Sequence, residues 1–120
     1  MSNACALSDQ SCAPCNGNTP ALTEEEVSHH MHSLKDWQLM RYDNVPQDFI
    51  YRKIKFKNFL TAMLFVNAVA ELAESEGHHP DIEIKYNYVA LSIYTHAVRA
   101  LSINDFILAA KIDKLLIKEQ

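Results

Sequence analysis

The stretch "IEIKYNYVALSIYT", residues 82–95, decides the fold, because its apolar and polar residues alternate on either side of a short turn. One side of the first half carries Ile82, Ile84 and Tyr86, and one side of the second half carries Val89, Leu91 and Ile93. Alternation with a period of two is typical of β-strands. We therefore predict a β-hairpin with its turn near Asn87.

Two more strands are expected upstream of this hairpin. Extended segments are predicted around Trp37–Tyr42 and Phe49–Phe56, separated by "DNVPQD", whose Asp, Asn and Pro residues favour turns. In the second segment apolar residues occupy one face and polar or aromatic residues the other, namely Ile50, Ile54 and Phe56 against Tyr51, Lys53 and Lys55. This pattern indicates a strand with one face in solvent.

Two helices begin with the same sequence signal. In "LTEEEV" Thr23 can cap the helix while Glu26, three residues later, reaches back, and in "LSINDF" Ser102 and Asp105 repeat the arrangement. We predict one helix from about Glu24 to Leu34 and another from Ser102 to about Ile117.

A third, longer helix is predicted between them, starting after Asn58 as the cap and stopping at Gly77. The resulting order, α-β-β-α-β-β-α, predicts an α+β fold in which three helices pack on one face of a four-stranded antiparallel sheet. On the last strand the uncovered face would carry Tyr88, Ala90, Ser92 and Tyr94. These side chains are rather apolar for a hydrated surface, so we expect a ligand floor or a subunit contact there.

Length and charge limit the class of protein. A chain of 120 residues that is 48% hydrophobic has enough material for one core, so we predict a single domain over residues 21–120. With 11 basic and 15 acidic side chains, it lacks the positive field of a direct nucleic-acid binder. No Lys or Arg precedes Lys35 and the longest apolar tract is interrupted by polar residues, so a soluble cytoplasmic protein with no membrane partner is expected.

The first 20 residues are interpreted as a flexible leader that contains all three cysteines, Cys5, Cys12 and Cys15. The "CAPC" spacing would suit a redox pair or a zinc knuckle completed by a histidine of the cluster His29, His30 and His32. Incidental thiols in a mobile tail are the alternative, which we favour because the leader offers little to pack.

The histidines of "EGHHPD", residues 76–81, are the main candidates for chemistry. His78 and His79 precede the hairpin and His96 follows it, so the three imidazoles should meet at one end of the sheet. Pro80 favours an extended backbone at His79, where adjacent side chains diverge. The two rings would thus approach a bound molecule from different directions.

Zinc is the competing interpretation of this trio, as in a zinc hydrolase. Adjacent side chains meet poorly on one ion, and zinc ligands from one segment usually stand further apart in sequence. General acid-base catalysis has no such requirement, and an imidazole with an ordinary pKa near ~6.5 can give or take a proton at neutral pH. We therefore predict acid-base chemistry without a metal.

The segment from residue 76 to residue 113 also resembles the pterin-4a-carbinolamine dehydratase family. The matching residues are His78, His79, Pro80, Tyr86, Val89, Thr95, His96, Leu101, Asp105, Leu108 and Ala109. "LTEEEV", Trp37, "IKFKNF" and the long middle helix are similar to the family too. Ala100 stands where the family usually has glycine, and the cysteine-bearing leader is outside the motif.

The resemblance implies dehydration of 4a-hydroxytetrahydropterin to quinonoid dihydropterin and water, in support of tetrahydropterin recycling. It implies acid and base roles for His78, His79 and His96, with no cofactor or metal. These histidines would also bind the pterin, helped by Pro80, Thr95, Ala97 and Val98. Asp81 is a candidate for orienting an imidazole.

The resemblance also implies partners. It suggests a homodimer or homotetramer, and an aromatic amino-acid hydroxylase as the source of the substrate. Some members of the family serve as dimerisation cofactors of transcription factors. A non-catalytic binding module of this kind is therefore the alternative function.

Overall fold

The computed structural model describes residues 6–13, 19–41 and 47–119, with side chains as far as Leu116. A short 3-10 helix, η1 (Leu7–Asp9), precedes the regular elements. These are α1 (Glu24–Met31), β1 (Gln38–Met40), β2 (Phe49–Lys55), α2 (Phe59–Glu76), β3 (Asp81–Lys85), β4 (Tyr88–Ile93) and α3 (Ile103–Glu119).

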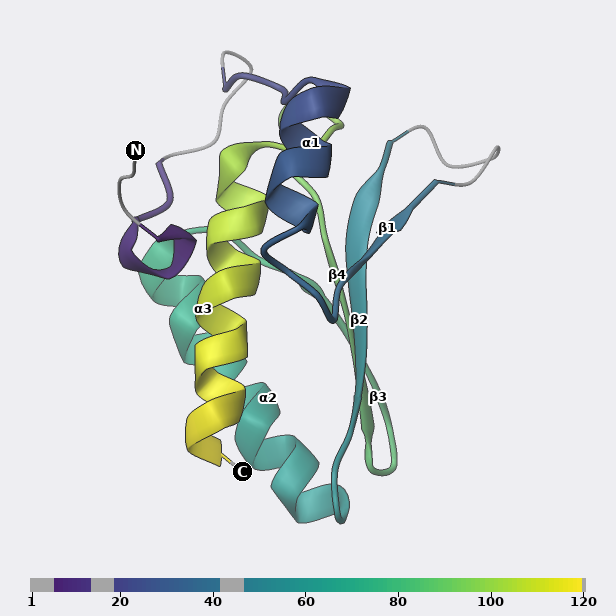
Figure 1. The fold of residues 1–120 in the computed structure, drawn as a ribbon. Coiled ribbons are helices and arrows are strands. Elements are labelled where there is room, and N and C mark those ends of the chain that lie inside the picture. The colour runs from purple at the N-terminus through teal and green to yellow at the C-terminus, as the bar shows by residue number, and fades with distance from the viewer. Residues whose placement is uncertain (1–5, 14–18, 42–46, 120) are drawn as a thin grey trace.

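The four strands form one antiparallel sheet in the order β1-β2-β4-β3, and the three helices lie on one side of it (Figure 1). The predicted hairpin is present, with Asp81 opposite Ser92 and Lys85 opposite Tyr88. Strand β2 inserts beside β4, where Ile54 faces Val89. The predicted α+β fold class is confirmed.

The hydrophobic core lies between the sheet and the helices. Its fully buried side chains include Ile50, Val89, Leu91 and Ile93 from the sheet and Phe65, Val69, Phe106, Leu108 and Ile112 from the helices. The strand residues alternate as the sequence predicts, because one face of each strand must be removed from water.

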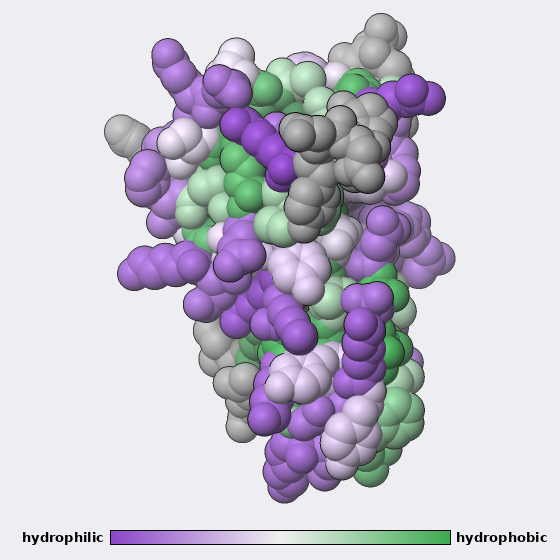
Figure 2. Space-filling view, turned by 90° about the vertical axis from the view of Figure 1, so that its right-hand side faces the viewer, coloured by the Kyte–Doolittle hydropathy of each residue, from purple (hydrophilic) through white to green (hydrophobic). Residues whose placement is uncertain are grey.

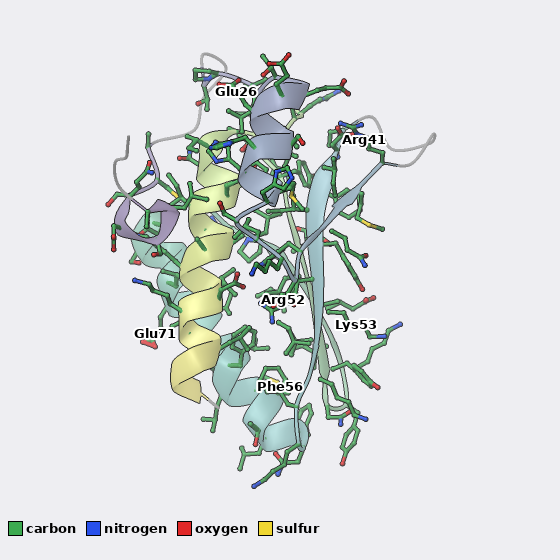
Figure 3. All side chains as sticks on the ribbon, in the orientation of Figure 1. Glu26, Arg41, Arg52, Lys53, Phe56 and Glu71 are labelled. Carbon is green, nitrogen blue, oxygen red and sulfur yellow. The ribbon has the colours of Figure 1, made fainter. Side chains whose placement is uncertain are left out.

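One charged group also lies on the covered face. Figure 3 shows Arg52 directed toward the helices, whereas the next residue, Lys53, points away from them. The guanidinium of Arg52 donates to Oδ1 of Asp113 on α3 at 2.6 Å, and the indole of Trp37 donates to the same oxygen at 2.9 Å. Burial raises the pKa of Asp113, while these two donors act in the opposite direction.

The predicted helix signals are present with one change of boundary. Thr23 and Glu26 form the capping box. However, α1 ends at Met31, and the predicted end at Leu34 is wrong. The reason is that the N–H groups of Ser33 and Leu34 bond to carbonyls three residues back, which turns the chain and buries Leu34.

The middle helix begins and ends as predicted. The Asn58 side chain accepts the Thr61 N–H at 2.8 Å, and Gly77 closes α2 in the left-handed conformation with φ of 67°. Glycine adopts this conformation without the Cβ clash that other residues meet. The chain therefore turns sharply just before the histidine pair.

The uncovered face of the sheet is mixed in polarity (Figure 2). The Lys53 ammonium lies 4.6 Å from the centre of the Tyr88 ring, and Ala90 is only 8% exposed. Tyr94, predicted on this face, lies beyond the end of β4 and packs against the core instead. The expected ligand floor or subunit contact stays a prediction.

The described part of the leader contacts the folded domain. Leu7 packs against the core, and η1 lies beside α3 (Figure 1). Cys12 is partly buried, while Cys5 and Cys15 lie outside the described residues. The division at residue 20 stays a prediction. None of the helices described here has the length and apolar character needed to cross a membrane.

Candidate active site

The predicted histidines line one hollow at the end of the sheet where the hairpin starts and finishes. Its volume is about 250 Å³, and its walls are Gly77, His78, His79, His96 and Ala97. Two other hollows, of about 220 and 240 Å³, have no histidine in their walls. The hollow that contains the three imidazoles is therefore the candidate active site.

His78 is the buried member of the trio. It follows the left-handed Gly77, and its backbone N–H bonds to the Ala73 carbonyl, so the end of α2 fixes its backbone. Only 5% of the residue is exposed. Its Nε2 lies 2.6 Å from Oδ1 of Asp105, near the start of α3. A hydrogen bond this short between an imidazole and a carboxyl group holds the ring in one orientation.

Asp105 is completely buried and hydrogen-bonded on both oxygens. Besides the contact of Oδ1 with His78, Oδ2 accepts the Thr95 hydroxyl at 2.9 Å and the Ser102 N–H at 2.8 Å. The Thr95 and Ser102 hydroxyls are 2.7 Å apart. Three separate segments thus hold one carboxylate, and the amino-terminal end of α3 adds a favourable dipole.

This arrangement selects the protonation form of His78. An ionised carboxylate can only accept hydrogen bonds, so it requires the imidazole proton on Nε2. With the proton on Nε2, Nδ1 is the ring nitrogen that carries the lone pair. A fixed tautomer next to a buried carboxylate is suitable for general acid-base catalysis.

His79 and His96 are more exposed. The Nε2 atom of His79 lies 2.5 Å from Oε2 of Glu74, in the last turn of α2, and both side chains are mostly in solvent. The His96 ring packs at 4.1 Å between centroids against Tyr94. Tyr94 therefore contacts a site histidine, although it is not on the sheet surface.

The other predicted site residues have different locations. Ala97 lines the hollow. Pro80, which follows His79 in the sequence, is half-buried. Thr95 is completely buried with its hydroxyl on Asp105. Val98 is half-buried in the turn after His96. Asp81 is exposed and lines the hollow on the uncovered sheet face.

Sequence reasoning assigned Asp105 only to helix capping, whereas the structure places its carboxylate on His78. Glu74, the partner of His79, was missed as well. The sequence feature that could have indicated a role of Asp105 in the site was its place in the family pattern. Its burial could not be read from one sequence, because it depends on the packing of α2, α3 and β4.

A metal centre needs several ligands close together. Within residues 6–13, 19–41 and 47–119, no group of three or more His, Cys, Asp or Glu side chains is arranged to hold a metal ion. His29 and His30 do lie close, with ring centroids 5.3 Å apart, and His30 also packs on Phe106. The zinc knuckle considered for Cys15 lies outside these residues.

The fold and the buried histidine-carboxylate pair define a small α+β protein with one hollow lined by histidines. The family model for pterin 4 alpha carbinolamine dehydratase matches residues 20–115. The chain belongs to this family.

Two relatives illustrate the similarity. A protein of Nitrosomonas eutropha is 46% identical over 118 residues, covering 98% of this chain and 99% of its own. One from Halorhodospira halophila is 41% identical over 110 residues, covering 92% and 97%. Both carry the name "Putative pterin-4-alpha-carbinolamine dehydratase".

Solved structures agree on the fold. A "transcriptional coactivator/pterin dehydratase" from Brucella melitensis superposes with a TM-score of 0.71 at 32% identity, over 80% of this chain and 98% of that one. A "pterin dehydratase-like protein", described as a RuBisCO assembly factor of the alpha-carboxysome, has a TM-score of 0.56 at 24% identity, over 72% and 93%. The second likeness concerns the fold alone.

Proposed function

We propose that the protein is a 4a-hydroxytetrahydropterin dehydratase, a hydro-lyase that forms quinonoid dihydropterin and water by histidine acid-base catalysis. The observation that carries the proposal is the convergence of His78, His79 and His96 on one hollow, with His78 held by the buried Asp105. Membership of the family supports the substrate class.

The reaction needs two proton transfers. An acid protonates the hydroxyl on ring carbon 4a, the C–O bond breaks and water leaves. A base removes the proton from the neighbouring ring nitrogen, and its electron pair forms the carbon-nitrogen double bond. The histidines supply both roles in this proposal, each contributing on the order of 10²- to 10⁴-fold to the rate. The atoms and electrons of this reaction balance without a cofactor.

The size of the hollow bears on how the substrate is held. Ligand pockets usually start near ~300 Å³, whereas this hollow measures about 250 Å³. We infer that the pterin ring enters it while the substituent on the ring points outward. His79 and His96, which are exposed, would contact the ring from the open side.

The test is a stopped-flow ultraviolet assay of carbinolamine decay with and without the protein. Replacing both His79 and His96 by Ala should abolish the acceleration. His29→Ala is the matched control, because it removes an exposed imidazole on α1 that is not part of the hollow. Decay at the wild-type rate in the double variant would refute the assignment.

The alternative is a non-catalytic binding module that acts as a dimerisation cofactor of a transcription factor. The name of the Brucella melitensis protein, which includes "transcriptional coactivator", is the observation in its favour. The double histidine variant separates the two functions, because it should lose turnover and keep partner binding.

We also propose that the chain forms a homodimer or homotetramer. All residues of β3, the strand at one edge of the sheet, are exposed, including Ile82 at 36% and Ile84 at 37%. Leu60 and Leu64, one turn apart on α2, are 69% and 54% exposed. Unpaired edges and exposed leucines are usually covered in the native assembly. Sedimentation equilibrium of wild type and Leu64→Lys would test this, since a monomeric wild type contradicts it.

The proposed setting is the cytoplasm, where an aromatic amino-acid hydroxylase would release the carbinolamine. Pterin recycling then depends on removal of the hydroxyl group before the ring is reduced again. Addition of the protein to a coupled hydroxylase reaction should shorten the lifetime of the carbinolamine intermediate.

A further inference from the structure

The contact between His78 and Asp105 joins two helix ends. His78 follows the carboxyl end of α2, and Asp105 lies in the first turn of α3. Helix ends are the parts of helices that open most easily. The 2.6 Å contact between the two side chains therefore needs the two ends to be held at a fixed separation.

The residues next to this pair bond to two consecutive residues, Cys12 and Ala13. Glu76 stands two positions before His78, and Asn104 stands one before Asp105. The Cys12 N–H donates to Oε1 of Glu76 at 2.8 Å. The next residue, Ala13, pairs with Asn104 in both directions: its N–H donates to Oδ1 at 3.0 Å, and its carbonyl accepts from Nδ2 at 2.8 Å.

Both acceptor side chains are well shielded from water. Asn104 is 1% exposed and the Glu76 side chain 11%. A buried amide that pairs with both backbone groups of one residue fixes that residue as a neighbouring strand would. The hydrogen bond from the Cys12 backbone, followed by that from Lys111, lowers the pKa of Glu76. The carboxylate is therefore charged, which strengthens both bonds.

Because Cys12 and Ala13 are consecutive, their Cα atoms are about 3.8 Å apart across a planar peptide. Two consecutive residues thus bridge the end of α2 and the start of α3. The preceding residues secure it, since Leu7 packs against the core and Asp9 lies 3.8 Å from Lys114 of α3. Residues 6–13 lie outside the region that matches the family model, which begins at residue 20.

We propose that residues 6–13 act as a strap that holds the His78–Asp105 pair in position, with Glu76 and Asn104 as positioning residues that act through His78 and Asp105. The activity part of this inference rests on the proposed dehydratase function. The structural part does not, because the orientation of His78 can be observed without substrate.

Two strap variants and one matched control test the proposal in the full chain. Asn104→Ala removes both bonds to Ala13. Ala13→Pro removes the Ala13 N–H donor and leaves the buried Asn104 side chain in place, although it also restricts the backbone at residues 12 and 13. Lys111→Met is the control: it breaks the Lys111–Glu76 ion pair between α3 and α2 and leaves the strap bonds intact. If Asn104→Ala does not fold, Ala13→Pro decides.

The first readout is the rate at which the Nε2 proton of His78 exchanges with water. Nuclear magnetic resonance of protein labelled with ¹⁵N-histidine measures this rate, and the signal is assigned by its absence in His78→Gln. We expect exchange of this proton with water to be about tenfold faster in both strap variants and unchanged in Lys111→Met. Wild-type exchange in Ala13→Pro would overturn the proposal, whatever happens to the melting temperature.

The second readout separates positioning from binding. The strap variants should lower kcat about tenfold, since ~1 Å of misplacement can cost ~10²-fold in rate. KM should stay within about twofold, because the strap bonds do not involve His79 or His96. If wild type has no dehydratase activity, the proposed function fails while the proton readout still decides the strap. Faster exchange with unchanged kcat would overturn the catalytic role of the strap.

Discussion

Replacing Asp105 by Asn changes one atom at the centre of the site. Oδ1 faces Nε2 of His78, and Oδ2 accepts from the Thr95 hydroxyl and the Ser102 N–H. If the new amide keeps its oxygen at the Oδ2 position, Thr95 and Ser102 retain their acceptor. The amide nitrogen then faces His78, which must accept a hydrogen bond on Nε2 and carry its proton on Nδ1.

The magnitudes follow from this exchange. A hydrogen bond to a charged group contributes about 1.5–3 kcal/mol, and a neutral one about 0.5–1.5 kcal/mol. Asp105→Asn should therefore lower the free energy of unfolding by only about 1 kcal/mol. The rate should fall far more, by about 10²-fold or more, because the proton of His78 now lies on the wrong nitrogen.

Urea denaturation measures the first quantity and the stopped-flow assay the second, while ¹⁵N shifts of His78 report the tautomer. Asp113→Asn is the matched control: this carboxylate also lies on α3 and accepts hydrogen bonds from Trp37 and Arg52, away from the hollow. It should affect stability and leave kcat unchanged. A kcat of Asp105→Asn within threefold of wild type, with the tautomer switched, would refute the assignment of His78.

Three further predictions concern stability, each measured by urea denaturation. Burial of the ring, together with the charge of His29, lowers the pKa of His30 from 6.5, so the unfolded chain takes up this proton first and stability should fall as the pH drops below about 6.5. His30→Gln should lose this part of the pH dependence, whereas the exposed His32→Gln should keep it. Arg99 has φ of 51°, in the left-handed region that glycine adopts more easily than arginine. Arg99→Gly should therefore raise the free energy of unfolding by about 0.5–1 kcal/mol, and a decrease would contradict this prediction. Gly77→Ala should lower it by about 1 kcal/mol through backbone strain alone, since a Cβ there would meet no atom within 4 Å; a loss above about 3 kcal/mol would show that packing is involved.

Local signals made most of the fold predictable. The capping box of Thr23 and Glu26 and the left-handed Gly77 depend on residues within a few positions of each other. The alternating pattern of the hairpin fixes which side of each strand faces the helices. The convergence of the histidines followed in turn, because the two strands of a hairpin start and finish at the same end of the sheet.

Long-range contacts were not predictable from the sequence. Asp105 carries a local capping signal and a distant contact with His78, and the sequence pattern reveals only the first. The bonds from Cys12 and Ala13 join residues more than 60 positions apart, in a segment whose composition suggested no packing. The end of α1 was misplaced for a related reason, because burial of Leu34 competes with helix continuation.

The β3–β4 hairpin also restricts how this protein can change in evolution. Its pairing from Asp81 with Ser92 to Lys85 with Tyr88 places the tip at Tyr86 and Asn87, far along the chain from His78 and Thr95. Residues added at the tip lengthen the ribbon and leave its base, where the site lies, undisturbed. A single residue inserted within either strand would instead exchange the two faces beyond it. Natural variation in length should therefore accumulate at the tip and be rare at the base.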